Sequence, residues 1–243
     1  VPQRVSLHSI LGLADGGFVV GWASYQLYTE YDVFARVFDD QGDAIGDEFQ
    51  VNLNNGVPYN YYASDYTYQQ DIQLAALNDG GFVAVWESEE QDGDYNGVFG
   101  QRFDVFGDTV GGEFQVNSET EEDQEDPDVV TLGDGSFVVT WESREQDGAQ
   151  DGVFAQRFAT NGTTPTPIGS EFQVNTVAEN NEEDPAIAAL SNGGFAVAWE
   201  SEDIRLQIFD AGGNQTPTAV TSPLVLTGGT GNDILVGGTG NDV

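Results

Sequence analysis

Four copies of one motif decide the fold: GGFVVGWAS at 16–24, GGFVAVWES at 80–88, GSFVVTWES at 135–143 and GGFAVAWES at 193–201. They contain all four tryptophans of the 243-residue chain. Each copy is rich in Val, Phe and Trp with a period of two, and Gly, Asp or Asn bounds it, as is typical of strands and turns. Because self-similarity at a fixed spacing marks a repeat architecture, the chain divides into four units of about 58 residues.

Three further segments recur around this motif. A short apolar run precedes each copy, and a strand-like segment follows it: DVFARVFD (32–39), GVFGQRFD (97–104), GVFAQRFA (152–159) and a shorter RLQIFD (205–210). The last segment of the unit is DEFQVN (47–52), GEFQVN (112–117) and SEFQVN (170–175). Asp-Gly and Asn-Gly pairs between the segments favour tight hairpins, and no stretch has helical periodicity.

Four repeats of four short strands predict an all-β fold, a β-propeller with four blades of four antiparallel strands. A pair of β-sandwiches or a linear β array is the alternative, although neither needs near-identical units. We place the propeller at 1–226. Its repeats are expected near 1–58, 59–118, 119–176 and 177–226. The first unit lacks a preceding EFQVN strand and the fourth lacks a clear one, so closure needs either TAVTSPLVL (218–226) or a blade missing from this chain.

The charge of the chain excludes several classes of function. Asp and Glu number 42 against 6 basic residues, all Arg, which gives a formal charge of -36. No basic stripe exists to neutralise phosphates, so we expect no nucleic-acid partner. So large an excess of negative charge repels itself in the compact state, which favours a setting rich in cations. One hypothesis is that the acidity serves only solubility at high salt.

Cysteine usage and hydropathy limit the location. The chain has no Cys, which excludes disulfides and thiolate nucleophiles. In an extracellular protein, bound calcium is then the expected means of stabilising the fold. No run approaches the ~20 apolar residues of a membrane span, so we expect no membrane insertion. The start, VPQRVSLHSILGL, lacks the features of a signal peptide, and the sequence is interpreted as a mature form or a fragment.

The tail at 227–243 contains GGTGNDILVGGTGNDV (228–243), one full and one nearly full copy of Gly-Gly-x-Gly-x-Asp-x-apolar-x. This segment resembles the nonapeptide of hemolysin-type calcium-binding (RTX) exoproteins. The resemblance implies a parallel β-roll in which Ca²⁺ is held by turn glycine carbonyls and Asp carboxylates. The matching positions are Asp233, Asp242, Gly228, Gly229, Gly231, Gly237, Gly238 and Gly240. Two copies imply at most one site between turns, and a Gly/Asn/Asp-rich linker is the alternative.

The blade repeats carry the same resemblance. The GGFVVxWES, FxQRFD and EFQVN segments are similar to repeats of large secreted RTX-type bacterial exoproteins. This resemblance implies a secreted, extracellular or cell-surface location rather than a particular activity.

A second calcium candidate lies in the loop QDGDYNG (91–97). Asp92, Asp94 and Asn96 alternate and are followed by Gly97, a spacing that can point three oxygens at one cation while glycine permits the turn. The bidentate Glu of an EF-hand is absent, because that position is Phe103. The equivalent loop of unit three keeps carboxylates at Asp147 and Asp151. A solvated hairpin loop is the alternative.

A more regular acidic set comes eleven residues before each repeat Phe: Asp71, Asp126 and Asp184, with Leu7 in the first unit. In a propeller these positions surround one mouth of the axial channel, where converging carboxylates can hold a cation or water. Turn initiation is the alternative. The glutamates that follow three of the tryptophans are expected to be exposed strand-end charges: Glu87, Glu142 and Glu200.

Aromatic residues fall into two groups. The repeat Trp and Phe side chains are expected to pack between blades. A tyrosine cluster occurs only in the insertion VPYNYYASDYTYQQ (57–70), and its members are Tyr59, Tyr61, Tyr62, Tyr66 and Tyr68. Exposed Tyr beside Asn and Asp is typical of carbohydrate or protein contacts, with a self-packing loop as the alternative.

Catalysis finds little support at this level. The one histidine, His8, lies in the atypical first unit, and no phosphate or dinucleotide motif occurs. Carboxylates are too abundant for any pair to be singled out. We therefore expect a secreted, noncatalytic, calcium-binding module for adhesion, extracellular matrix or surface-layer assembly, or glycan binding. The alternative is an ancillary or substrate-binding part of an extracellular polysaccharide hydrolase or lyase.

Overall fold

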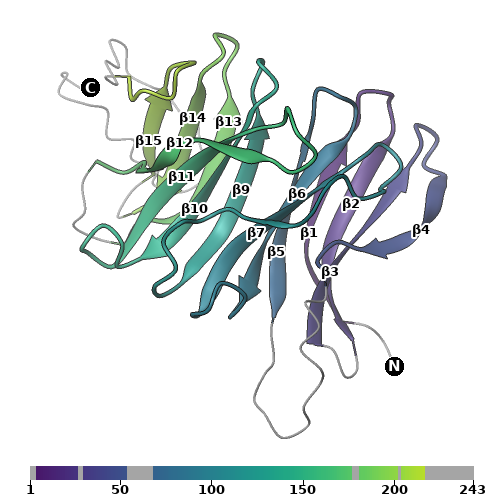
Figure 1. Ribbon diagram of the computed structural model, residues 1–243, viewed down its shortest axis with the longest axis horizontal. Helices are drawn as coiled ribbons and strands as arrows, with labels where there is room; N and C mark the ends of the chain where they lie inside the picture. The colour runs from purple at the N-terminus through teal and green to yellow at the C-terminus, as the bar shows by residue number, and fades with distance from the viewer. Residues whose placement is uncertain (1–3, 27–29, 54–67, 177–180, 202–203, 217–243) are drawn as a thin grey trace, which may run out of the picture.

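The structure is a computed structural model that describes residues 4–26, 30–53, 68–176, 181–201 and 204–216 (Figure 1). The described residues form strands and turns with no helix. The first two sheets contain β1 Arg4–Gly12, β2 Phe18–Gln26, β3 Glu30–Phe38, β4 Ala44–Gln50, β5 Gln69–Ala76, β6 Phe82–Glu89, β7 Asn96–Phe103 and β8 Phe114–Gln115. The next two contain β9 Gln124–Thr131, β10 Phe137–Arg144, β11 Asp151–Ala159, β12 Thr166–Gln173, β13 Glu183–Ala189, β14 Phe195–Glu200 and β15 Arg205–Phe209.

Each repeat folds into one antiparallel sheet whose strands follow in chain order. The sheets are β1-β2-β3-β4, β5-β6-β7-β8, β9-β10-β11-β12 and β13-β14-β15. The first strands of successive sheets lie beside one another, β1 by β5, β5 by β9 and β9 by β13 (Figure 1). This arrangement confirms the predicted β-propeller architecture of four blades. The fourth blade has three strands among the described residues, and 218–226 lies outside them.

The blades pack through two unlike faces, which follow from the alternation of side chains along a strand. In blade two, Phe82, Trp86, Phe99 and Phe103 face the valines and alanines of blade one, and all four rings are at most 6% exposed. The same contact recurs between blades two and three, and between blades three and four. The expectation that the repeat aromatics pack between blades is confirmed for these three interfaces. We call the two surfaces of a blade its Phe/Trp face and its Val/Ala face.

The EFQVN segment contacts both its own blade and the next blade. Its Phe packs on the next blade's stacked Phe pair, as Phe114 does on Phe137 and Phe158, at ring distances of 6.2 and 5.4 Å. Its Asn side chain accepts the backbone N–H at the start of the third strand, as Asn117 does from Val98 at 2.9 Å. A buried N–H without a partner would cost about 1–3 kcal/mol, so this amide has a structural role in the blade.

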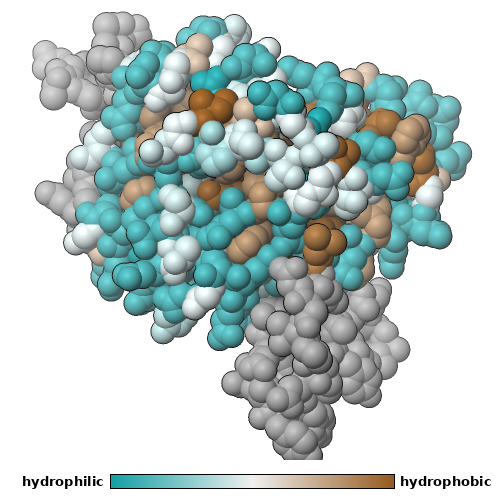
Figure 2. All heavy atoms as spheres, in the orientation of Figure 1, coloured by the Kyte–Doolittle hydropathy of each residue, from teal (hydrophilic) through white to brown (hydrophobic). Residues whose placement is uncertain are grey.

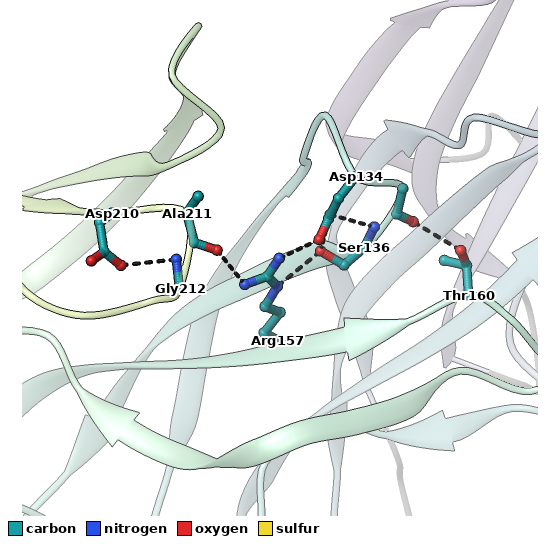
Figure 3. Close-up of polar contacts among 8 residues, drawn as sticks. Asp134, Ser136, Arg157, Thr160, Asp210, Ala211 and Gly212 are labelled. Atoms are coloured by element: carbon teal, nitrogen blue, oxygen red, sulfur yellow. Dashed lines mark hydrogen bonds and ion pairs between the residues drawn. The ribbon is translucent and has the colours of Figure 1, made fainter.

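Arginine joins the rims of neighbouring blades. Arg157 donates to Asp134 and Ser136 of its own blade at 2.6 and 2.9 Å, and to the carbonyl of Ala211 in blade four at 2.9 Å (Figure 3). Arg102 makes the corresponding contacts between blades two and three. The planar guanidinium, with several donors in fixed directions, suits such a bridge better than the ammonium of Lys.

Candidate functional site

Asp71, Asp126 and Asp184 occupy the same bulge in three successive inner strands. Each is a non-glycine residue with positive φ, at 49°, 48° and 49°. In each blade the pairing between the first two strands shifts register at this point, and blade one has its shift between Ser6 and His8. A bulge redirects a side chain, and left-handed backbone at a non-glycine residue is strained and concentrated at functional sites. The regular spacing of these aspartates therefore reflects a bulge that recurs in each of the three inner strands.

The three bulges meet at one end of the inner strands. Their aspartates line a single pocket of about 280 Å³ together with Gln73, Asp128, Ala186 and the prolines at 127 and 185. The prolines fit a bulge because their missing N–H would have no ladder partner there. The structure thus brings Asp71, Asp126 and Asp184 together.

Glu87 completes this group from the neighbouring strand β6. It is 2% exposed, so the expectation of an exposed strand-end charge was wrong. One carboxyl oxygen accepts the backbone N–H of Asp126 in the next blade at 2.8 Å, and the other accepts the side-chain amide of Gln70 at 3.0 Å. Asp71, Glu87 and Asp126 each offer a carboxylate oxygen, and these oxygens lie within 4.8 Å of one another. Such a trio could hold a metal ion.

Burial and neighbouring charges raise the pKa values of these carboxyl groups by different amounts. Burial, and then the charge of Asp71, raises the pKa of Glu87 to about 9. Burial, followed by the charges of Asp71 and Asp184, raises the pKa of Asp126 to about 6. The pKa of Asp71 is also raised, chiefly by burial, although Glu87 hydrogen-bonds to it and opposes the shift. At neutral pH, Glu87 therefore carries a proton while Asp126 is largely ionised.

The equivalent glutamates of the other blades show that burial of this carboxyl group depends on the blade that follows. Glu142 pairs with Glu125 across the sheet and is partly buried, and burial together with Asp151 raises its pKa to about 8. Glu200 is exposed, as expected, because no described blade follows the fourth. The repeat places a carboxyl at the same position three times, but only the covering blade buries it.

The loop 91–97 directs its oxygens to different partners. Asp92 accepts the side-chain amide of Asn117 at 2.9 Å, and Asp94 accepts the backbone N–H of Glu122 at 3.0 Å. Asn96 donates from its side chain to Glu125 at 2.6 Å. These contacts tie the hairpin to its own blade and to the segment that leads into blade three. Calcium binding at this loop stays a prediction.

Gly97 has a different role from the expected turn. It lies in β7, and a Cβ there would be 2.5 Å from a carboxylate oxygen of Asp92, so the glycine makes room for that side chain. Gly93, at φ 109°, supplies the positive φ of the loop. Gly152 has the same role in blade three, since a Cβ there would be 2.8 Å from the carboxylate of Asp147.

The acidic residues of unit three follow the same plan. Asp147 accepts the side-chain amides of Gln173 and Asn175, each at 3.0 Å. Asp151 opens β11, and its carbonyl accepts the N–H of Glu182 at 3.0 Å. Asp147 therefore holds the EFQVN strand of its own blade, as Asp92 does.

Several predicted site residues lie outside the described residues. These are Tyr59, Tyr61, Tyr62, Tyr66, Asp233, Asp242, Gly229, Gly231, Gly238 and Gly240. Tyr68 is described: it is 40% exposed, and its backbone N–H donates to Glu89 at 3.2 Å. His8 is exposed on β1. No helix in the described ranges is long and apolar enough to cross a membrane.

Comparison with known proteins places the fold among solved propellers. No family model and no curated protein matches the chain. A protein of unknown function from Dyadobacter fermentans aligns at a TM-score of 0.63 and 10% identity, over 88% of this chain and 68% of that one. The α-L-arabinanase of Penicillium chrysogenum, solved with arabinobiose, aligns at 0.56 and 14%, over 86% and 58%. A thermostable family-43 glycoside hydrolase aligns at 0.51 and 8%, over 89% and 74%.

These comparisons correct the functional expectation. At such identities they establish a shared fold, and both of the neighbours described above whose activity is named are glycoside hydrolases. The prediction of a noncatalytic module for adhesion or assembly is contradicted by this finding. The alternative, an ancillary or substrate-binding part of an extracellular polysaccharide hydrolase or lyase, agrees better with these neighbours.

Proposed function

We propose that this chain acts on carbohydrate and hydrolyses glycosidic bonds at the acidic channel mouth, as part of an extracellular polysaccharide hydrolase. The observation that carries the proposal is the convergence of three bulge aspartates, from three blades, on one pocket. Glycoside hydrolysis requires one protonated and one ionised carboxyl group on either side of the scissile bond. Carboxyl groups of unlike acidity are what this site contains.

The roles follow from acidity and position. Asp126 lines the pocket, and its pKa of about 6 suits a general acid that protonates the leaving oxygen as the bond to the anomeric carbon breaks. Asp184 lines the same pocket and is assigned as the base, which takes a proton from the water that adds to that carbon. Glu87 does not line the pocket and acts as a positioning residue, because its proton is held against Asp71.

Substrates with unlike leaving groups test the assignment. We expect release of reducing sugar from at least one of arabinan, galactan and xylan, and a loss of about 100-fold in kcat/KM for Asp126→Asn and for Asp184→Asn. An aryl glycoside with an acidic phenol needs no proton donor, so Asp126→Asn should retain activity on it while Asp184→Asn should not. Asn tolerates positive φ, which preserves the bulge. Asp43→Asn, at an exposed turn, is the matched control.

Two outcomes would contradict the proposal. If the chain neither hydrolyses these polysaccharides nor is retarded by them in affinity electrophoresis, it does not act on these glycans. If hydrolysis occurs but both bulge variants keep wild-type rates, the catalytic groups lie elsewhere.

We propose Ca²⁺ as the ion for the trio Asp71, Glu87 and Asp126, since hard oxygen ligands suit calcium. Because a bound ion would keep Asp126 deprotonated, the general acid proposed above acts in the calcium-free form of the site. Binding would require Glu87 to lose its proton, so near pH 7 each ion bound there should release up to about one proton. Calcium in the tail, and secretion, remain predictions from the RTX resemblance.

Thermal unfolding with EGTA, Ca²⁺ and Mg²⁺ at matched ionic strength tests the ion. We expect a rise in Tm specific to Ca²⁺, accompanied by proton release in calorimetry with buffers of different ionisation enthalpy. Glu87→Gln should abolish the proton release, whereas Asp233→Ala combined with Asp242→Ala should leave it unchanged. The absence of a calcium-specific rise would refute calcium at both places.

A further inference from the structure

Among the described residues, no blade lies against the Phe/Trp face of the first blade. Phe18 and Phe38 stack at 4.9 Å, as the equivalent Phe pair does in every other blade, and Trp22 stacks on Phe34 at 6.3 Å. Phe18, Trp22 and Phe38 are partly exposed, whereas Phe82, Trp86 and Phe103 of blade two are at most 1% exposed. The face seen in Figure 2 is mostly hydrophilic, with apolar residues over the first sheet and at several other places. An apolar face in so acidic a chain indicates an interaction surface.

The three interfaces inside the molecule show what covers such a face. In each, a Val/Ala face lies against the rings, as Val19, Ala35 and Val37 do against blade two. In each, the Phe of the preceding EFQVN segment also packs on the stacked pair: Phe49 contacts Phe103 at 5.3 Å, and Phe172 contacts Phe209 at 5.4 Å. Residues 1–17, which precede Phe18 in this sequence, contain no EFQVN segment.

The opposite end of the propeller presents the complementary surface. On blade four the Val/Ala face consists of Ala196, Ala198, Leu206 and Ile208, and Leu206 is 36% exposed. In blade three the corresponding residues Val138, Thr140 and Ala155 are fully buried by the next blade. No extensive packing joins the first and fourth blades in the described part of the chain.

We propose that the Phe/Trp face of blade one is the docking surface for one further blade of the same repeat type. That partner presents a Val/Ala face and the phenylalanine of an EFQVN strand, which would cap Phe18 and Phe38. Its own Phe/Trp face would cover Leu206 and Ile208 of blade four. A second copy of this chain fits less well, since the blade four that it would offer has no EFQVN phenylalanine among its described residues.

Adding a blade to the full chain tests the proposal. The fusion carries a second copy of residues 119–177 ahead of Val1, so that Asn175 of the added copy precedes Leu7 by nine positions, as Asn175 precedes Asp184 between blades three and four. Since Trp86 and Trp141 are fully buried, Trp22 should dominate quenching by acrylamide in the unmodified chain. We expect quenching to fall severalfold in the fusion, with a higher Tm. Phe172→Ser in the added copy should reverse part of both changes.

Three results would overturn the proposal. One is unchanged quenching of Trp22 in a fusion whose added repeat is folded by far-ultraviolet circular dichroism. Another is an added repeat that remains as sensitive to protease as an unfolded chain. The third is concentration-dependent dimerisation of the unmodified chain in sedimentation, abolished by Phe38→Asp and by Leu206→Asp, which would make a second copy the occupant.

Discussion

The inner-strand bulges and the outer hairpin loops are both acidic and both repeated, yet their carboxylates meet different partners. Asp71, Asp126 and Asp184 converge on one pocket and lie near one another. Asp92 and Asp147 receive side-chain amides from the EFQVN segments of their own blades. Whether a repeated acid serves chemistry or architecture thus depends on whether its neighbour is another acid or an amide donor.

The geometry of a propeller causes this difference. First strands of successive blades lie side by side, so a side chain redirected by a bulge meets its equivalents from other blades. In the hairpin between the second and third strands, Asp92 and Asp147 instead meet the last segments of their own blades. Substitutions at the EFQVN amide, at the buried glutamate beside the bulges and in the hairpin loop test this difference, in decreasing order of expected effect.

Asn117→Ala should lower the free energy of unfolding by about 3 kcal/mol, because the buried N–H of Val98 loses its acceptor. The variant also removes the donor to Asp92 and to Gln124, at 2.9 and 2.8 Å. Urea unfolding followed by tryptophan fluorescence measures the change. A loss below about 0.5 kcal/mol would show that the EFQVN amide does not hold the blade.

Glu87→Gln should stabilise the protein in the bulge region, and increasingly so as pH rises. The folded pKa of Glu87, about 9, lies above its unfolded value of 4.5, so the folded state binds the extra proton between these values. Stability from this group is therefore complete below pH 4.5 and is lost as pH rises toward 9, by up to about 1.4 kcal/mol per unit. Gln mimics the protonated acid and removes this loss.

Urea unfolding at pH 5 and pH 6.5 in EGTA gives the measurement. The difference between Glu87→Gln and the natural chain should grow by about 2 kcal/mol between these two values, at about 1.4 kcal/mol per pH unit. Glu200→Gln is the matched control at the equivalent, exposed position, and it should stay within about 0.5 kcal/mol at both values. Equal effects of the two variants would refute the distinction that burial by the next blade creates.

Asp92→Ala should have the smallest effect, a loss of about 1 kcal/mol or less. Asn117 retains the carbonyl of Glu119 and the side chain of Gln124 as acceptors, at 2.7 and 2.8 Å, so one lost partner is tolerated. Thermal unfolding with and without Ca²⁺ adds a second readout. If Asp92→Ala removes a calcium-specific rise in Tm, the outer loop is a metal site and the contrast between the two regions fails.

The spacing of the repeats in the sequence was enough to predict the blade architecture and part of the candidate site. The spacing of GGFVVGWAS and its copies predicted the blades, and counting back from the repeat Phe picked out Asp71, Asp126 and Asp184. The role of Glu87 was missed, because the backbone N–H that contacts it belongs to the next blade. Gly97 was assigned to the turn, although it accommodates a side chain from its own loop.

By itself the sequence determined the number of repeats, the strands within each and the alternation of Phe/Trp with Val/Ala, since these are properties of neighbours along the chain. Only the tertiary structure decided which equivalent residues meet. Glu87, Glu142 and Glu200 hold one position in the repeat, yet burial by a following blade raises the pKa of Glu87 to about 9 while Glu200 stays exposed. Desolvation by a neighbouring blade is a long-range effect, so identical local sequences acquire different chemistry.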